Sequence, residues 1–300
     1  MIKIYTTIFF ILLQAASISA NNANYFTTDD NAKIYYREWS PDTKPRAVVI
    51  IIHGIGFESE PYQMLGVALN PYGVAVYGID LRGHGLSDGE RGMLSPAACH
   101  SEDITEFIKI LRKKYPDIPV FLSGDSMGGL IALHTAKNSS NYIDGLILIS
   151  PAISPNPKQF IGPELPLLAI ISLFNWKARM ISIVDNRLDI SSRDKAFVTL
   201  RRSDEKAQKS VSLQYILQIS RDSNNWQKRI APHIKIPILI LNGSRDNVVL
   251  SSSGKMLYNL VGSKDKTKKL YQGAYHTLLW DDMSDEVLND IKRWVLKHIE

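Results

Sequence analysis

Residues 120–136 read Val120-Phe121-Leu122-Ser123-Gly124-Asp125-Ser126-Met127-Gly128-Gly129-Leu130-Ile131-Ala132-Leu133-His134-Thr135-Ala136. The apolar run before the first glycine is typical of a buried strand, and the stretch after the last glycine is typical of a helix. Ser126 therefore falls where a strand turns sharply into a helix. Gly124 and Gly128 are needed on either side of it because the two backbones nearly touch in so tight a turn, and a Cβ there would collide. The pattern predicts a nucleophile elbow, which presents the Ser126 hydroxyl at the top of a sheet.

Strand and helix patterns alternate along most of the chain. Continuous apolar runs, many of them β-branched, predict strands buried on both faces at residues 47–52, 74–79, 120–123, 146–149 and 238–241. We expect a further strand of the same kind at residues 268–271. Amphipathic stretches predict helices at residues 102–114, 130–137, 254–260 and 286–298. This alternation predicts an α/β fold built on a mostly parallel, doubly wound sheet.

The alternation stops between Pro151 and about Lys235. This stretch contains a proline-rich segment, an apolar segment at 165–174 and a charged segment at 185–209. Because it follows a strand and precedes the return of the pattern, we expect a helical cap over the carboxyl ends of the strands, where open sheets bind ligands. The chain then divides into a first core segment (21–150), the cap insertion (151–235) and a second core segment (236–300).

The first twenty residues have the features of an export signal. Lys3 supplies a charge, residues 4–13 are apolar, and a run of small residues closes at Ala20. We expect cleavage near Ala20 and a periplasmic or secreted mature protein. The alternative is an uncleaved membrane anchor, but the apolar part is shorter than the roughly twenty residues that span a bilayer.

Composition excludes several classes of protein. The 300 residues are 45% hydrophobic and 22% charged, as in an ordinary globular chain. The net charge is +5, but the basic residues are scattered among acids, so we expect no nucleic-acid partner.

The single cysteine, Cys99, cannot form an internal disulfide and is expected to pack on a helix as a small apolar side chain. No His or Cys cluster has metal-ligand spacing, so neither a metal nor another cofactor is expected. Nothing in the sequence indicates the oligomeric state.

A serine hydroxyl is a poor nucleophile at neutral pH, and it needs a nearby base and a third group that orients this base. Asp246 follows the predicted strand at 238–241, and His276 follows the last strand. The carboxyl ends of parallel strands share one edge of the sheet, so both side chains are expected beside Ser126. Asp125 and Asp222 are the competing acids, but Asp125 directly precedes the nucleophile and must point away from it.

Ester chemistry also needs donors for the negative oxygen of the tetrahedral intermediate. The backbone N–H of Met127 is the first candidate, since it opens the helix after the serine. The loop His53-Gly54-Ile55-Gly56 follows the first strong strand, and we predict the N–H of Ile55 as the second donor. His53 is expected to support this loop rather than to transfer protons.

Five motifs occur in order along the chain: Gly54, Gly56 and Tyr62; Asp80-Leu81-Arg82-Gly83-His84-Gly85-Leu86-Ser87-Asp88-Gly89-Glu90-Arg91; Gly124 to Gly129; Leu148-Ile149-Ser150-Pro151; and Gly273-Ala274-Tyr275-His276. Together they resemble the monoacylglycerol lipase and lysophospholipase family of α/β-hydrolases, of the serine aminopeptidase S33 type. The resemblance covers nearly the whole chain after residue 20 and thins in the cap. It implies a cofactor-free serine esterase of single-chain glycerolipids, with Ser126, Asp246 and His276 as triad, Ile55 and Met127 as oxyanion donors, and a structural role for His84.

Three positions depart from the animal enzymes that the chain resembles. Phe57 and Pro61 stand where those enzymes carry Glu and Arg near the glycerol end of the pocket, and Leu279 replaces a polar residue three positions after the histidine. Each change removes a partner for a buried glycerol hydroxyl, at a cost of about 1 to 3 kcal/mol for a group left unpaired. These departures affect the preference for the headgroup and leave the acyl chemistry unchanged.

The leading hypothesis is hydrolysis of a monoacylglycerol or lysophospholipid through an acyl-enzyme on Ser126. The apolar segment at 165–174 suggests an acyl-ester lipid as substrate and peripheral contact with a membrane or lipid surface, although it is also suited to pack on the core. Alternatives on the same triad are acyl transfer and a broad-specificity esterase or thioesterase. A non-catalytic binding module is a further alternative.

Overall fold

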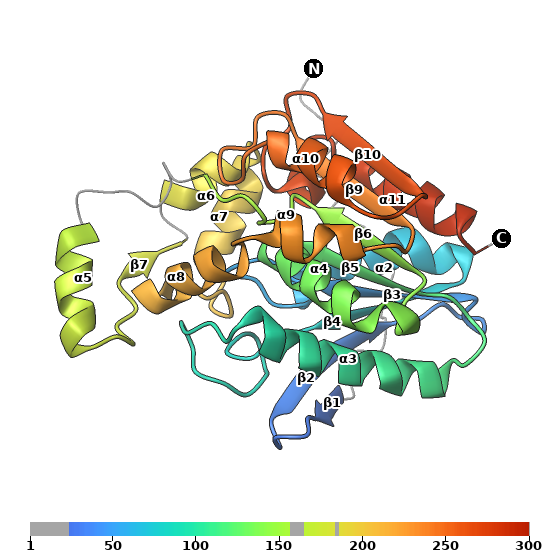
Figure 1. Cartoon of the computed structure of the whole chain (residues 1–300), viewed down its shortest axis with the longest axis horizontal. Coiled ribbons are helices and arrows are strands. Elements are labelled where there is room, and N and C mark those ends of the chain that lie inside the picture. The colour runs from blue at the N-terminus through green and yellow to red at the C-terminus, as the bar shows by residue number, and fades with distance from the viewer. Residues whose placement is uncertain (1–23, 157–164, 184–185, 300) are drawn as a thin grey trace.

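The computed structural model describes residues 24–156, 165–183 and 186–299. Its centre is an eight-stranded sheet with the order β1-β2-β4-β3-β5-β6-β9-β10 (Figure 1). The strands are β1 (Asn24–Thr27), β2 (Lys33–Trp39), β3 (Ala47–Ile52), β4 (Val74–Ile79), β5 (Val120–Asp125), β6 (Gly145–Ile149), β9 (Ile238–Gly243) and β10 (Lys266–Tyr271). From β4 to β10 neighbouring strands are parallel, so the predicted α/β fold with a mostly parallel sheet is confirmed.

The antiparallel edge formed by β1 and β2 was not predicted from the sequence. Both pairings of β2, with β1 and with β4, are antiparallel. β2 carries Lys33, Arg37 and Glu38 among its aromatic residues and is only partly buried. It therefore lacks the continuous apolar run that marks a strand covered on both faces.

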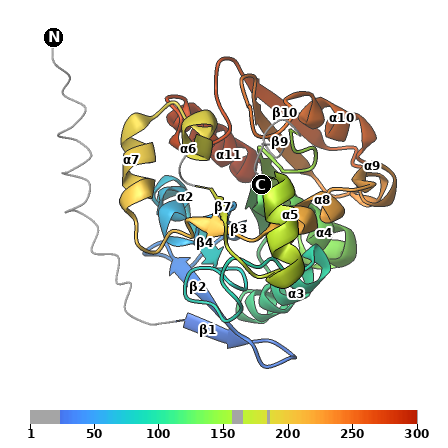
Figure 2. The same cartoon turned by 90° about the vertical axis from the view of Figure 1, so that its left-hand side faces the viewer.

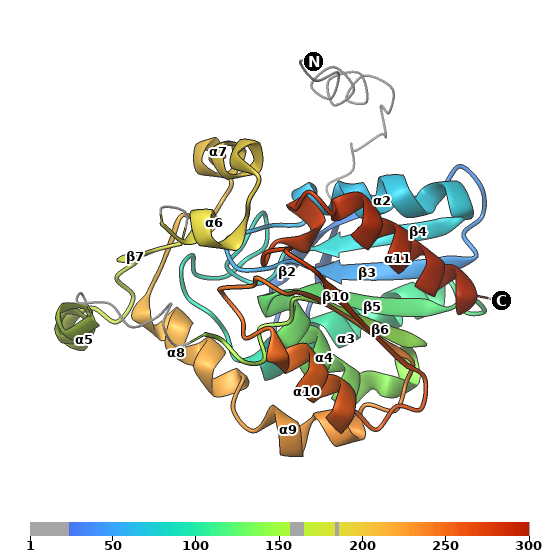
Figure 3. The ribbon, with the colours of Figure 1, turned by 90° about the horizontal axis from the view of Figure 1, so that it is seen from above.

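Helices cover both faces of the sheet, as Figure 3 shows from above. One face carries α2 (Gln63–Leu69) and α11 (Ser284–Lys297), and the other carries α3 (Ala97–Lys114), α4 (Met127–Ser139) and α10 (Ser252–Leu260). Short 3-10 turns complete the core at η1 (Glu60–Tyr62), η2 (Asn70–Tyr72), η3 (Ser140–Tyr142), η5 (Ala231–His233) and η6 (Leu278–Trp280). The apolar face predicted for α3 is buried: Ile104, Phe107, Ile108 and Leu111.

The cap segment (151–235) lies between β6 and β9 in the sequence. Its described elements are α5 (Leu165–Phe174), β7 (Ile181–Ser182), α6 (Asn186–Ser191), α7 (Lys195–Ser203), β8 (Ser210–Val211), α8 (Leu213–Asp222) and α9 (Trp226–Arg229). Elements α5 to α8 gather at one end of the sheet, which Figure 2 shows face-on. Of these, α5 lies farthest from the sheet (Figure 3).

The predicted export signal at residues 1–20 lies outside the described residues. Among residues 24–156, 165–183 and 186–299, no helix combines the length and the apolar character needed to cross a membrane.

Candidate active site

The predicted turn from strand to helix is present around Ser126. β5 ends at Asp125 and α4 begins at Met127, while Ser126 itself has φ 52° and ψ −114°. A Cβ on Gly124 would lie 2.3 Å from the carbonyl oxygen of Gly128, and a Cβ on Gly128 would lie 2.1 Å from the carbonyl oxygen of Ile52. These close approaches lock the serine into a backbone conformation that a non-glycine residue rarely adopts.

The structure brings Ser126, His276 and Asp246 together in one hydrogen-bonded chain. The Ser126 hydroxyl lies 2.8 Å from Nε2 of His276, and Nδ1 of the same ring lies 2.7 Å from Oδ2 of Asp246. All three residues are buried. These distances allow the imidazole to accept the serine proton while the carboxylate holds the ring.

Two further sets of hydrogen bonds fix the acid and the base. Oδ1 of Asp246 accepts from the backbone N–H of Val248 (2.8 Å) and Val249 (2.9 Å), which leaves Oδ2 for the histidine. The hydroxyl of Ser150, at the end of β6, donates to the carbonyl oxygen of His276 (2.8 Å). Burial acts to lower the pKa of His276, but the charge of Asp246 and its hydrogen bond outweigh burial, so the pKa of the imidazole lies above its ordinary value.

The competing acids are engaged elsewhere. Asp222, at the end of α8, accepts from the N–H of Ala97 (3.0 Å) and so caps the start of α3. Asp125 accepts from the Tyr62 hydroxyl (2.7 Å), and burial raises the pKa of its carboxyl to about 6. Neither carboxylate forms a hydrogen bond with the His276 ring.

The two predicted oxyanion donors line the same cavity as Ser126 and His276. In the described part of the chain, neither the N–H of Ile55 nor that of Met127 has a hydrogen-bond acceptor. The Ile55 loop is anchored on one side by Tyr62, whose hydroxyl accepts from the N–H of Gly54 (3.0 Å) while donating to Asp125. Free N–H groups on an anchored loop are the arrangement that a developing oxyanion requires.

His53 and His84 are buried supports of the loops around the site. His53 bonds the carbonyl of Gly54 through Nδ1 (2.9 Å), and its Nε2 accepts from the N–H of Leu81 (3.0 Å). Nδ1 of His84 lies 3.0 Å from the carbonyl oxygen of Arg82. Burial lowers the pKa of His53 to about 4 and that of His84 to about 3, so both rings are neutral at pH 7.

The cap segment is fastened to the core at three loops of the site. The Tyr215 hydroxyl of α8 lies 2.9 Å from Nε2 of His84. Thr277, next to the histidine, donates through its N–H and its hydroxyl to the carbonyl of Ser191 at the end of α6. The guanidinium of Arg201 on α7 donates to the carbonyl oxygen of Gly56 (2.9 Å).

Sequence reasoning did not single out Tyr215 or Arg201, nor the link from Tyr62 to Asp125. One signal was available for Arg201: it shares a helix face with Phe197 and Val198, so a charged residue occupies a position suited to an apolar one. For the tyrosines we find no local signal, because their partners lie far away in the sequence.

A cavity of about 100 Å³ opens beside the serine, between cap and core. Ser126, Asp125, His276, Thr277 and Ser191 are its polar residues. Its other lining residues are Gly54, Ile55, Phe57, Met127, Ala152, Pro155, Ile183, Leu188, Ile219, Val248 and Val249. The lining is mostly apolar with a few polar groups, and it suits an apolar ligand that presents one polar group to Ser126.

Phe57, one of the positions that depart from the animal enzymes, lines the cavity, and Leu279, another of them, is buried in η6. Neither side chain offers a hydrogen bond to a headgroup.

The parallel sheet, the strand-to-helix turn and the hydrogen-bonded serine, histidine and aspartate define a serine hydrolase of the α/β-hydrolase fold. The chain belongs to the family described as serine aminopeptidase, S33, whose model matches residues 43–283.

Relatives and solved structures agree with this assignment. The chain is 34% identical to the monoglyceride lipase of Rattus norvegicus, over 90% of this chain and 89% of that protein. It is 31% identical to the monoglyceride lipase of Homo sapiens, over 93% and 92% of the two chains. The crystal structure of a soluble variant of monoglyceride lipase from Saccharomyces cerevisiae, in complex with a substrate analog, is similar with a TM-score of 0.80 and 25% identity, over 92% of this chain and 94% of that one. These similarities do not favour acyl transfer or a non-catalytic module.

Proposed function

We propose that this chain hydrolyses the ester bond of single-chain acyl glycerolipids, a monoacylglycerol or a lysophospholipid, through an acyl-enzyme on Ser126. The observation that carries the proposal is the apolar cavity that ends at the Ser126–His276 hydrogen bond. An acyl chain fits such a wall, and the ester carbonyl then reaches the hydroxyl. The relatives named monoglyceride lipase support the same substrate class.

In this mechanism Ser126 Oγ attacks the ester carbonyl while Nε2 of His276 takes its proton. The N–H groups of Ile55 and Met127 bind the oxygen that becomes negative. As the tetrahedral intermediate collapses, the imidazolium returns the proton to the departing alcohol. Water then repeats the sequence on the acyl-enzyme and releases the fatty acid. Asp246 holds the imidazole in the required tautomer and stabilises its charged form.

Covalent labelling with a fluorophosphonate probe tests the site, and Ser126→Ala should abolish the label. The matched control is Ser123→Ala, since Ser123 is a buried serine of β5 outside the cavity lining. Labelling that persists in Ser126→Ala or that fails in the Ser123→Ala control would contradict the proposal.

Substrate class is tested with p-nitrophenyl esters of increasing chain length and with purified monoacylglycerols and lysophospholipids. We expect kcat/KM to rise from acetate to medium or long acyl chains, because each buried methylene adds about 0.8 kcal/mol of transfer free energy. Products formed in the presence of added glycerol separate hydrolysis from acyl transfer. A sharp preference for acetate would exclude a lipid-binding cavity.

We further propose peripheral contact of the cap with a lipid surface through the α5 tip, defined as Ile170, Leu173, Phe174, Trp176 and Met180. These side chains are strongly exposed, with Leu173 at 81% and Phe174 at 88%. Apolar side chains that face water on a segment standing away from the sheet are suited to enter a lipid interface.

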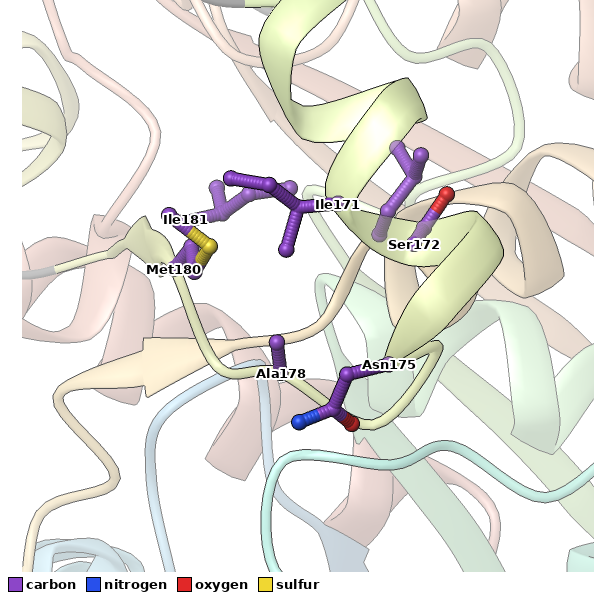
Figure 4. Close-up of a pocket in the computed structure, with 7 residues that line it drawn as sticks. Ile171, Ser172, Asn175, Ala178, Met180 and Ile181 are labelled. Atoms are coloured by element: carbon purple, nitrogen blue, oxygen red, sulfur yellow. The ribbon is translucent and has the colours of Figure 1, made fainter.

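Further apolar residues lie behind α5. A small hollow of about 10 Å³ lies behind α5, and Figure 4 shows Ile171, Met180 and Ile181 at its wall. Ile183, two residues after Ile181, lines the active-site cavity. The closeness of Ile181 and Ile183 along the chain supports entry of an acyl chain from the lipid surface beneath α5.

Vesicle flotation tests this contact with the double variant Leu173→Ser, Phe174→Ser. We expect weaker binding to phosphatidylglycerol-containing vesicles and a lower rate on vesicle-borne monoacylglycerol, with unchanged hydrolysis of a soluble p-nitrophenyl ester. Val67→Ser is the control, because Val67 is 58% exposed on α2, away from the cap. Equal flotation of wild type, control and double variant would rule out the contact.

Export is a separate proposal. We propose that the chain is exported to the periplasm or medium and cleaved after Ala20, since its first twenty residues carry the charge, apolar stretch and small residues of a signal peptide. N-terminal sequencing of the protein recovered from the native host should begin at Asn21. Recovery of the intact N-terminus in the membrane fraction would favour the anchored alternative.

A further inference from the structure

An arginine of the cap segment binds the Ile55 loop at the carbonyl group of Gly56. Arg201 lies on α7, is only 4% exposed, and its Nη2 donates to the carbonyl oxygen of Gly56 (2.9 Å). On the other side of the loop, the N–H of Gly54 donates to the Tyr62 hydroxyl. Ile55 therefore lies between two anchored residues, one held by the core and the other by the cap.

The charge of Arg201 is compensated within the same contact. Its Nη1 lies 2.6 Å from Oδ2 of Asp204 and 3.6 Å from Oε1 of the buried Glu58, and the guanidinium stands 4.3 Å from the centre of the Phe57 ring. A buried guanidinium is costly unless it is paired and its donors are satisfied. The same helix face buries Phe197 and Val198, so apolar side chains fill the rest of this contact.

Gly56 packs closely against the cap segment. It has φ +78°, and a Cβ there would lie 2.7 Å from the Ile183 side chain, so the loop runs directly against the cap. The Gly56 carbonyl shares a peptide plane with the N–H of Phe57, and this N–H donates to the carbonyl oxygen of Gly54 (3.2 Å). The Gly54 carbonyl in turn shares a peptide plane with the N–H of Ile55, so the directions of the Gly56 carbonyl and the Ile55 N–H are linked.

We propose that Arg201 is a positioning residue for the oxyanion hole: by holding the Gly56 carbonyl from the cap, it fixes the direction of the Ile55 N–H. The inference rests on the proposed function, since an oxyanion hole matters only if Ser126 attacks an ester. It makes the position of the cap a condition for the chemical step as well as for substrate binding.

The experiment compares Arg201→Ala and Arg201→Lys with Arg202→Ala. Arg202 is the next residue of α7, and its guanidinium pairs with Asp189 at the surface of the cap, so this control removes an arginine without touching the loop. Steady-state kinetics on a soluble p-nitrophenyl ester give kcat and KM separately, and thermal unfolding reports folding. Added guanidinium chloride at millimolar concentration tests chemical rescue.

A donor of the oxyanion hole is worth about 10² to 10³ in kcat, and a misdirected donor keeps part of that value. We therefore expect Arg201→Ala to lower kcat by roughly 10- to 100-fold with KM within about threefold, Arg201→Lys to lose less, and guanidinium to restore kcat in Arg201→Ala but not in wild type. Arg202→Ala should match wild type.

The inference is overturned if folded Arg201→Ala keeps the kcat of Arg202→Ala, or if its loss is confined to KM. Should Arg201→Ala fail to fold, Arg201→Lys decides by the same division between kcat and KM. Failure of the proposed function has a different signature, because wild type and Arg202→Ala would then both be inactive on every acyl ester.

Discussion

The substitution Asp246→Asn tests the geometry of the acid most directly, because the structure dictates how the new amide must lie. Oδ1 of Asp246 accepts from the N–H groups of Val248 and Val249, so the amide oxygen of an asparagine has to remain there. Its NH₂ group then replaces Oδ2 at 2.7 Å from Nδ1 of His276. Two donors cannot face each other, and the imidazole must carry its proton on Nε2 instead.

That proton would point at Ser126, 2.8 Å away, so the ring could no longer accept the serine proton. In serine proteases the wrong tautomer costs about 10⁴ in kcat, or roughly 5.5 kcal/mol of transition-state stabilisation. We expect the same order of loss here, with little change in KM. Removal of the carboxylate also removes the charge that raises the pKa of His276, so the residual acid limb of the pH–rate profile should move to lower pH.

The assay is kcat and kcat/KM for a soluble ester between pH 5 and 9, with thermal unfolding as the control for folding. In wild type, activity should fall as pH drops through the pKa of His276, which lies above its ordinary value of 6.5. An Asp246→Asn variant that keeps more than about a tenth of wild-type kcat would refute the assignment of Asp246, since the tautomer argument predicts a far larger loss.

Three further predictions concern buried residues of the core. Gly128→Ala places a Cβ 2.1 Å from a backbone oxygen and should lower the free energy of unfolding by about 3 kcal/mol or more, which a urea titration measures; a loss below about 1 kcal/mol would contradict the packing. Burial lowers the pKa of His100 to about 3 in the folded chain, whereas an unperturbed histidine in the unfolded chain has a pKa of about 6.5. Below about pH 6.5 the unfolded chain therefore binds a proton at His100 that the folded chain does not bind, and the free energy of unfolding decreases as the pH falls. In His100→Leu the free energy of unfolding, measured by chemical denaturation, should decrease less steeply between pH 6.5 and 4. An unchanged dependence of this free energy on pH would refute the lowered pKa of His100. Tyr62→Phe leaves Asp125 and the N–H of Gly54 without their shared partner and should cost about 1 to 3 kcal/mol of stability together with a fall in kcat; full activity and stability would show that the hydroxyl is dispensable.

The sheet was predictable wherever burial on both faces leaves a continuous apolar run. The runs at 47–52 and 74–79 coincide with β3 and β4, because every side chain in these central strands is buried. The antiparallel strands β1 and β2 are only partly buried, and their mixture of aromatic and charged residues has no such signature. The expectation that residues 268–271 form a strand buried on both faces was wrong, because β10 is an edge of the sheet and only its Tyr271 is buried. The two-residue strands β7 and β8 are too short for any periodicity to appear.

The three members of the candidate triad were predictable for a topological reason. Each follows a parallel strand, and parallel topology brings the ends of such strands to one edge of the sheet. The supports were not predictable in this way. Arg201 meets Gly56 across 145 residues of sequence, and Tyr215 meets His84 across 131, through a cap whose packing no local pattern specifies. Sequence patterns therefore located the candidate reacting groups, whereas the contacts that orient them required the three-dimensional structure.

The three fastenings of the cap have a consequence for engineering. A designer who transplants the insertion from a relative to change headgroup preference would exchange the pocket wall and, unintentionally, the clamps on the catalytic loops. A chimera lacking counterparts of Arg201, Tyr215 and the Ser191 carbonyl would fold with an accommodating pocket but a poorly aligned reaction centre. Productive grafts should therefore carry both halves of each junction, so that Gly56, His84 and Thr277 are redesigned together with the donor segment.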